Sequence, residues 1–385
     1  MQTEKKTHRV NNGFFKYIFT VALATVFLAC SRPVTEKDVE TGNILTQRAQ
    51  LLTMVELPDS SIAVIIKNPW DTASVLGRYL LVDRNLPDDQ IPEREGWKTI
   101  KVPVQSALIY SSVHTSPLEE LGSAGMITGI ADAAYFSSNY IRQNIEKGAI
   151  TDVGNSMSPS LEKIVELSPE IAIVSPYENS GHGILDKTGT TVIDMADYME
   201  STPLGRAEWI KLLGALSGKR EMAEKIYLGI VEKYDSISNA ALKINSEPLV
   251  LCELPISGVW YQPGGESYMS RLITDAGGRP LLKEDKNPGS VQLDIANVYD
   301  KGVNSEIWLI KATKELTGRD ITDATALASE IKAMKTGNVW YVNTTSSNFY
   351  DELAFHPEKI LEDFASVFHP EIFKNEKRYF KKIKL

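Results

Sequence analysis

Side chains with catalytic potential come together at Ser111, Ser112 and His114. A hydroxyl activated by an imidazole can attack a carbonyl carbon, but it also needs an orienting acid and a sharp turn. No Gly-x-Ser-x-Gly elbow surrounds either serine. The histidines show neither zinc-ligand spacing nor a His-Glu-x-x-His pattern. The sequence therefore predicts that the protein is not an enzyme and holds no metal through protein ligands alone.

The first cysteine, Cys30, ends an apolar run from Tyr17 to Ala29 that follows four basic residues. This run is too short and too unevenly flanked for a membrane-spanning helix, so it predicts a secretory signal. Leu28-Ala29-Cys30 resembles the lipobox of bacterial lipoproteins, in which cleavage leaves the cysteine as an acylated N-terminus. The resemblance implies that Cys30 is lipidated and that the body is anchored in the cell envelope, facing the periplasm. The alternative is an ordinary signal peptide with an incidental cysteine.

The body that remains after removal of residues 1–29 is acidic. Processing discards four basic residues and one acidic residue, so the formal net charge changes from −9 to −12. This charge argues against binding to nucleic acid or to anionic lipid headgroups. Cys252 alone remains, which excludes an internal disulfide, and its apolar neighbours Leu249, Val250 and Leu251 predict a buried, unreactive thiol.

The pattern of apolar residues predicts an α/β protein with two Rossmann-like lobes joined by one long helix. Short apolar runs alternate with helical stretches after residue 101. Apolar residues recur every three or four positions over 219–245, which predicts a helix of about 40 Å that can cross between lobes. We expect these segments: signal peptide 1–29, tether 30–46, N-terminal β extension 47–100, lobe one 101–218, interlobe helix 219–245 and lobe two 246–385.

Strands are predicted in both lobes and in the extension, where β-branched and aliphatic residues cluster between turn residues. The predicted strands of the lobes are Ala107–Tyr110, Met126–Ile130, Ile171–Val174, Thr191–Met195, Pro248–Leu254, Ile307–Lys311 and Val339–Val342.

Short stretches in serial order over residues 100–385 carry a family resemblance. They include Val102-Pro103-Val104, Leu118–Gly122 and Ser160–Glu170 in lobe one, and Gly264–Ser267 and Asn338–Tyr341 in lobe two. These stretches resemble the substrate-binding proteins of ABC importers for iron-siderophores, haem and cobalamin, and Pro203–Lys211 is similar to a lipoprotein branch of the Bacteroides type. The resemblance implies a monomer with a cleft between its lobes, an ABC permease with its ATPase as partners, and no cofactor.

Ligand-contacting side chains are expected where strands end, the usual ligand position in open α/β sheets. Aromatic and neutral polar residues dominate these loops, and the cations there are Lys286, Lys314 and Arg319. A bulky, nearly neutral chelate, such as a corrinoid or a hydroxamate siderophore, fits this composition better than an anionic tris-catecholate complex. The alternative is that some of the rings are core residues. The candidates are Ser112, His114, Tyr135, Ser156, Tyr177, Trp260, Tyr261, Gln262, Phe349 and Tyr350.

Two of the candidate residues have two interpretations, and a third departs from the family pattern. His114 could be an axial ligand of haem iron or corrinoid cobalt, or it could form a structural hydrogen bond at a helix start. Glu162 matches the family position where an acid meets permease arginines, and it would equally suit the first turn of a helix. Asp294 is the corresponding acid in lobe two, although the family usually has a glutamate just before a Val-Tyr-like pair and this chain differs there.

The resemblance implies a lipid-anchored substrate-binding protein that captures a metal chelate and delivers it to a permease. Two alternatives remain open at this point. One is a tetrapyrrole-processing enzyme of the same two-lobed shape. The other is a capture protein that is not coupled to an ABC permease.

Overall fold

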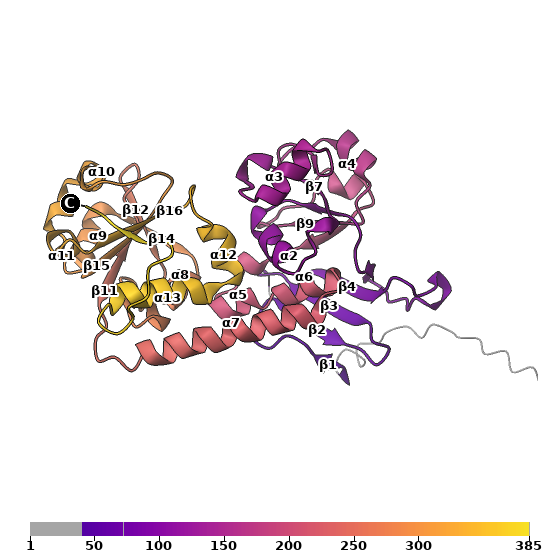
Figure 1. The fold of residues 1–385 in the computed structure, drawn as a ribbon, viewed down its shortest axis with the longest axis horizontal. Coiled ribbons are helices and arrows are strands. Elements are labelled where there is room, and N and C mark those ends of the chain that lie inside the picture. The colour runs from indigo at the N-terminus through magenta and orange to yellow at the C-terminus, as the bar shows by residue number, and fades with distance from the viewer. Residues whose placement is uncertain (1–40, 72, 385) are drawn as a thin grey trace, which may run out of the picture.

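The computed structural model describes residues 41–71 and 73–384. The expected signal peptide, the lipidation residue Cys30 and most of the expected tether lie outside the described residues. Two α/β lobes stand side by side above a long helix, α7, with a further sheet beneath lobe one (Figure 1). The predicted architecture is confirmed. No helix in the described part of the chain has the length and apolar character needed to cross a membrane.

Lobe one is built on a parallel sheet with the strand order β10-β9-β6-β7-β8. The buried aliphatic residues of β6, β7, β9 and β10 confirm the four strands predicted for this lobe. The strands are β6 (Ala107–Ile109), β7 (Ile127–Ile130), β8 (Thr151–Asp152), β9 (Ile171–Val174) and β10 (Thr191–Asp194). The helices are α2 (Thr115–Glu120), α3 (Asn139–Glu146), α4 (Leu161–Leu167), α5 (Pro203–Ala207) and α6 (Ile210–Leu216).

Lobe two has a sheet of order β13-β11-β15-β16-β17, parallel except for β17, and a separate two-stranded antiparallel sheet of β12 and β14. The three strands predicted here, now β11, β15 and β16, are confirmed, and the two-stranded sheet was not predicted. The strands are β11 (Leu249–Cys252), β12 (Val259–Pro263), β13 (Arg279–Pro280), β14 (Ser290–Asp294), β15 (Ile307–Ala312), β16 (Val339–Asn343) and β17 (Lys381–Lys382). The helices are α8 (Tyr268–Asp275), α9 (Ile295–Gly302), α10 (Gly318–Ala324), α11 (Lys332–Lys335), α12 (Phe349–Phe355) and α13 (Pro357–Phe368).

The interlobe helix α7 runs from Arg220 to Ala241, 22 residues and about 33 Å. One face of it is buried, and its members recur every three or four residues: Ala223, Tyr227, Ile230, Tyr234, Ile237 and Ala241. This face packs on α6 of lobe one and on α8 and α13 of lobe two. The predicted crossing helix is confirmed, although it ends at Ala241 and Met222, expected on the buried face, is 46% exposed.

The N-terminal extension is a five-stranded sheet in which β4 and β5 pair in parallel and the other neighbours pair antiparallel. The predicted limits, 47 and 100, are too narrow. Asn43 and Ile44 already pair with β2, and the buried Thr46 donates its hydroxyl hydrogen to the Leu52 carbonyl. The strands are β1 (Asn43–Ile44), β2 (Leu52–Glu56), β3 (Ile62–Lys67), β4 (Val75–Asp83) and β5 (Lys98–Val102).

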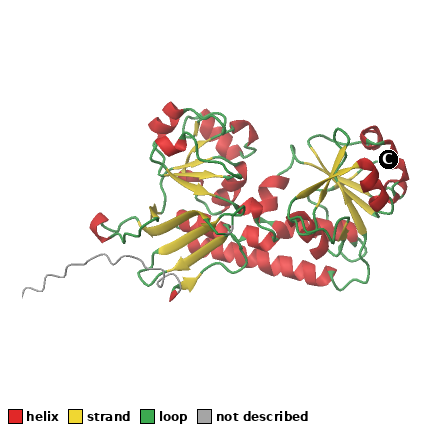
Figure 2. Ribbon diagram, turned by 180° about the vertical axis from the view of Figure 1, so that it is seen from behind, coloured by secondary structure: helices red, strands yellow, loops and turns green. Residues whose placement is uncertain are grey.

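Two buried carboxylates hold the extension against lobe one. Figure 2 shows the sheet of the extension next to lobe one from behind. Glu208, 0% exposed, accepts the backbone N–H groups of Gln47, Arg48 and Ala49 at 2.7–3.0 Å. Glu200 accepts the next two, from residues 50 and 51, and the Trp209 indole N–H at 3.0 Å. Charge-assisted bonds of this kind are about twice as strong as neutral ones, so the extension is an integral part of the fold.

Replacing Glu208 with alanine is expected to lower the free energy of unfolding by roughly 3 to 5 kcal/mol. The substitution leaves three backbone N–H groups without their acceptor and removes one of the two carboxylates that pair with the Lys211 ammonium, Glu208 at 3.2 Å and Glu224 at 2.9 Å. Urea denaturation measures the change. Glu232→Ala, at an exposed position of α7, is the matched control and should stay within about 0.5 kcal/mol of the unchanged protein.

Candidate functional site

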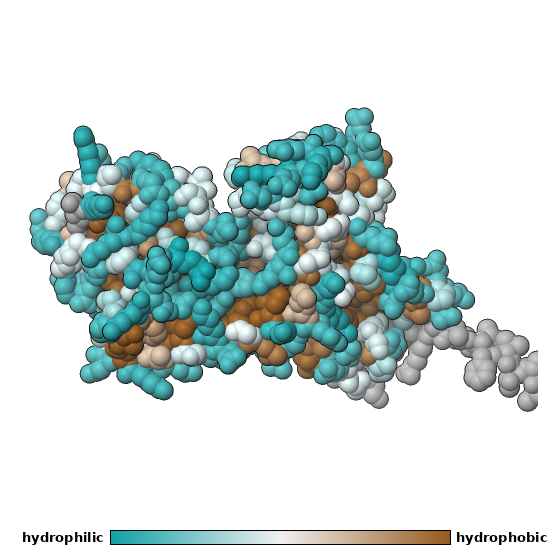
Figure 3. Space-filling view, in the orientation of Figure 1, coloured by the Kyte–Doolittle hydropathy of each residue, from teal (hydrophilic) through white to brown (hydrophobic). Residues whose placement is uncertain are grey.

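The carboxyl edges of the two parallel sheets face each other. Helix α12 follows the carboxyl end of β16 in lobe two, and it contacts the 3₁₀ turn Ser112–His114, which follows the carboxyl end of β6 in lobe one. Figure 3 shows a notch between the lobes on the upper side of the molecule. Ligands of open α/β sheets bind at such edges, so this notch is the candidate site.

Six of the predicted residues offer surface: five follow strands of the two parallel sheets, and Tyr261 lies in β12, which packs on β11. Tyr135, Tyr177, Tyr261 and Tyr350 are between 43% and 78% exposed, which is unusual for four rings of this size. Ser112 and Ser156 are half-buried. The tyrosines combine an apolar face with a polar tip, a combination that suits a large ligand with both apolar and hydrogen-bonding surface.

His114 is not at the surface, and the axial-ligand interpretation is wrong. It is 1% exposed, and its Nε2 lies 2.9 Å from Oδ1 of the buried Asp197, whose Oδ2 accepts a hydrogen bond from Arg206 Nε at 3.0 Å. Burial alone would raise the pKa of Asp197, but Arg206 and His114 outweigh it and lower the pKa. The alternative interpretation, a structural hydrogen bond at a helix start, is confirmed.

Trp260, Gln262 and Phe349 were also expected to contact a ligand, and this expectation is wrong because none is more than 1% exposed. The Trp260 indole donates to the carbonyl oxygens of Cys252 and Glu253 at 2.9 and 3.0 Å, which fixes the β12–β14 sheet on the end of β11. Burial raises the pKa of the Cys252 thiol to about 12, so the predicted buried thiol is confirmed.

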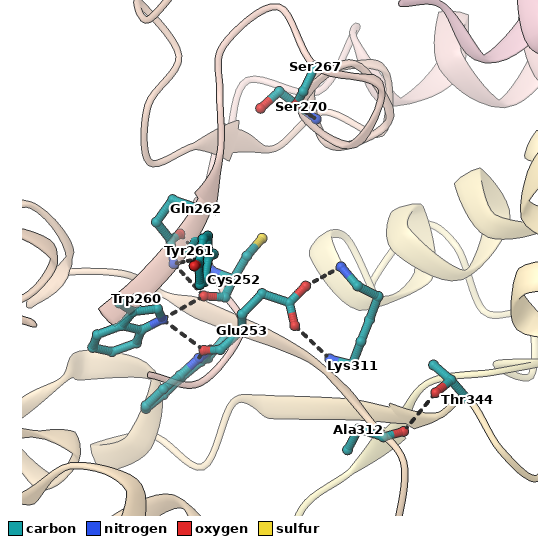
Figure 4. Close-up of polar contacts among 11 residues, drawn as sticks. Cys252, Glu253, Trp260, Tyr261, Gln262, Ser267, Ser270, Lys311, Ala312 and Thr344 are labelled. Atoms are coloured by element: carbon teal, nitrogen blue, oxygen red, sulfur yellow. Dashed lines mark hydrogen bonds and ion pairs between the residues drawn. The ribbon is translucent and has the colours of Figure 1, made fainter. Parts of the chain in front are cut away.

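A Glu253–Lys311 ion pair lies where β11 and β15 end, and the sequence did not single it out (Figure 4). The Glu253 carboxylate accepts both the backbone N–H of Lys311, at 3.2 Å, and its ammonium. Glu253 has a φ of 60°, a costly conformation for a non-glycine residue, and its carbonyl also accepts the Trp308 indole N–H at 2.8 Å. Lys311 did not stand out in the sequence because it is the last residue of a predicted strand, Ile307–Lys311.

Asp351 was also missed, and it connects the two lobes directly. From the first turn of α12 it accepts hydrogen bonds from Ser112 Oγ at 3.2 Å and from Ser137 Oγ at 3.0 Å. Both serines belong to lobe one. The only indication of its role in the sequence was its position directly after two predicted ligand residues, Phe349 and Tyr350.

A second junction between the lobes lies at His356, between α12 and α13. Its Nε2 is 2.8 Å from Glu120 of lobe one, and its Nδ1 is 3.1 Å from Glu358. Burial alone would lower the pKa of His356, but the two carboxylates outweigh it and raise the pKa to about 9. The imidazolium is therefore the charged partner of both glutamates at neutral pH.

The stability of the lobe junction is expected to fall as pH rises from about 6.5 to about 9. The folded pKa of His356, about 9, exceeds its ordinary value of 6.5, so its contribution is complete below 6.5 and is lost as pH passes 9. The shift corresponds to roughly 3 kcal/mol. Urea denaturation across this pH range measures the change, and the pH-dependent difference should disappear in His356→Gln. Equal pH profiles for both proteins would contradict this assignment.

The two predicted docking acids are both exposed. Glu162 lies in the first turn of α4, at the outer end of lobe one in Figure 1. Asp294 caps α9 by accepting the Asn297 backbone N–H at 2.8 Å. Asp294 thus has a structural role in addition to any contact it makes with a partner.

Charges elsewhere at the candidate loops are paired within lobe two. Lys286 lies 3.2 Å from Glu266, Lys314 2.6 Å from Asp320 and Arg319 3.5 Å from Asp323. Across the described ranges, no group of three or more His, Cys, Asp or Glu side chains could hold a metal ion.

A groove of about 1920 Å³ lies away from the notch, between the N-terminal sheet and α7. Its floor includes Met54, Ile62 and Leu81, and Arg220 and Glu56 pair across its wall at 2.9 Å. None of the predicted ligand residues lines this groove, so we do not assign it to the candidate site.

Comparison with known proteins gives consistent matches. The family model for periplasmic binding proteins matches residues 109–344. An uncharacterized lipoprotein of Methanocaldococcus jannaschii is 24% identical over 321 residues, covering 79% of this chain and 75% of that protein. The ferric-anguibactin-binding protein FatB of Vibrio anguillarum is 25% identical, covering 51% of this chain and 65% of that one. A periplasmic haem-binding protein of Pseudomonas aeruginosa superimposes with a TM-score of 0.56 and 16% identity, covering 73% of this chain and 99% of that chain.

Proposed function

Because the chain belongs to the periplasmic binding protein family, we propose that it is the substrate-binding component of an ABC importer. It captures a metal chelate, either an iron-siderophore, haem or cobalamin, between its two lobes and delivers it to the permease. The observation that carries this proposal is the set of four exposed tyrosines. Tyr135, Tyr177 and Tyr350 follow strands of the two sheets that face each other, and Tyr261 lies in β12, which packs on β11.

The ligand proposed for these tyrosines is large and close to neutral. Each ring can bury apolar ligand surface while its hydroxyl meets a polar fringe, which suits a corrinoid or a hydroxamate complex. A tris-catecholate complex needs cations to offset its desolvation, and Lys286, Lys314 and Arg319 already pair with acids of their own lobe. The name of the ferric-anguibactin-binding relative supports a ferric chelate.

The protein has no catalytic role in this proposal. His114, the base that a serine nucleophile would need, is buried, with Nε2 bonded to Asp197 and Nδ1 without a hydrogen-bond partner, so it reaches no serine hydroxyl. The lipid anchor at Cys30 also belongs to the proposal, and the name of the Methanocaldococcus lipoprotein supports it. A lipidated Cys30 would hold the body at the membrane, close to a permease.

One ligand among cyanocobalamin, haemin and ferrioxamine B is expected to quench the tryptophan fluorescence of residues 31–385 with a submicromolar Kd. The exposed tyrosines provide the contact surface, so Tyr177→Ala should weaken binding by up to about tenfold, the upper worth of one aromatic contact. Titration with correction for inner-filter absorption measures both effects. Failure of all three ligands to bind would count against capture of a metal chelate.

Charge reversal at Glu162 is expected to abolish uptake of the bound ligand while its Kd stays unchanged. Glu162 is exposed on α4 and far from the buried core, so Glu162→Lys should leave the fold intact. The matched control is Glu166→Lys, one turn along the same helix and also exposed. Transport in cells carrying each variant is the measurement. Normal uptake with Glu162→Lys, or equal loss with both variants, would rule out a specific docking role.

A further inference from the structure

A carboxylate with no cationic partner faces lobe one from the first turn of α12. Asp351 is half-buried, and its two oxygens accept hydrogen bonds from the Ser112 and Ser137 hydroxyls. Among the residues that the structure describes, no lysine, arginine or histidine lies within ion-pair distance of it. Two neutral donors only partly replace the water that an ionised carboxylate loses on burial.

The nearest cation on the same wall cannot offset this charge. Lys311 is already committed to Glu253, which binds both its ammonium and its backbone N–H, as Figure 4 shows. Burial alone would lower the pKa of Lys311, but Glu253 outweighs it and raises the pKa, so the lysine stays charged and paired. The indole N–H groups of Trp260 and Trp308 hold the Glu253 backbone in its conformation of positive φ, which keeps the ion pair from rearranging.

Asp351 is also placed where a ligand can reach it. Its neighbour Tyr350 is 48% exposed, and Ser112 lies at the carboxyl edge of lobe one. A ligand group that donates a hydrogen bond to Asp351, from an ammonium or an amide N–H, would supply the further donor that this carboxylate lacks. The same group would contact both lobes at once. An anionic group at the same point would meet uncompensated repulsion.

Building on the proposed function, we propose that Asp351 is a specificity-determining residue, which selects chelates with zero or positive net charge that present N–H donors. Ferric hydroxamates with a free ammonium group and corrinoids with an amide fringe belong to this class. Tris-catecholate complexes and haem, whose propionates are anionic, do not. The negative charge of the Asp351 side chain, and not the shape of that side chain, produces this selectivity.

The test measures binding of ferrioxamine B, its N-acetylated form, a ferric tris-catecholate, haemin and cyanocobalamin to the chain from Ser31 to Leu385. If ferrioxamine B binds, Asp351→Asn should weaken it about tenfold or more, the worth of one charge-assisted hydrogen bond. The N-acetylated form keeps an amide N–H but loses the ammonium charge, so Asp351→Asn should weaken it by a smaller factor. If cyanocobalamin alone binds, Asp351→Ala should weaken it about tenfold. The matched control is Asp323→Asn, an exposed acid of the same lobe, which should change neither Kd.

Several outcomes would overturn the inference. If the unchanged protein binds haemin or the tris-catecholate more tightly than the neutral and cationic probes, selection by charge is ruled out. Capture of a metal chelate would still be supported. Equal weakening of both ferrioxamine forms by Asp351→Asn, or no loss of cyanocobalamin binding in Asp351→Ala, would give Asp351 a merely structural role. No binding of any probe would overturn both proposals. Thermal unfolding of each variant confirms that it is folded.

Discussion

The burial of one face of α7 against both lobes is the packing interaction on which the rest of the molecule depends. Its buried side chains contact α6 at one end and α13 at the other, so each lobe completes its core on the same helix. Polar bonds from the middle of the helix fix it to both lobes: Tyr227 donates to the Leu204 carbonyl of lobe one and Tyr234 to Asp275 of lobe two, at 3.3 and 2.8 Å. A rotation of one lobe would have to break these buried bonds, which favours small motions on ligand binding.

Helix α12 makes the two lobes into one site. It belongs to lobe two by sequence, yet it packs on α2, α5 and the Ser112–His114 turn of lobe one. Asp351 at its start and His356 just past its end each bond to lobe one. Charged groups therefore hold the floor of the site on both sides of the helix, whereas tyrosines supply the accessible surface.

Periodicity predicted the elements well, because helix α7 and the buried strands depend on short-range patterns. The candidate site was less predictable, since its decisive contacts join distant residues. Nothing near His114 indicates Asp197, and nothing near Asp351 indicates Ser112. Trp260 and Phe349 occupy loops and edges where an aromatic ring serves a core as readily as a ligand. The start of the extension was missed for the same reason: β1 has two residues, and the loop after it is held by Glu208, about 160 residues away.

The distribution of charge explains why exposed tyrosine rings occur together with a half-buried ion pair, Glu253 with Lys311. Lys311 at the end of β15 would otherwise be a cation on the ligand-facing wall and would attract anions. Glu253 neutralises that charge. The strained backbone of Glu253 is in turn held by two buried tryptophans, Trp260 and Trp308, whose indole N–H groups donate to its carbonyl oxygen. With Lys311 neutralised, Asp351 is the charge left facing lobe one from α12. A wall built of tyrosines with one acid binds through apolar area and hydrogen bonds, and its electrostatic field disfavours anions.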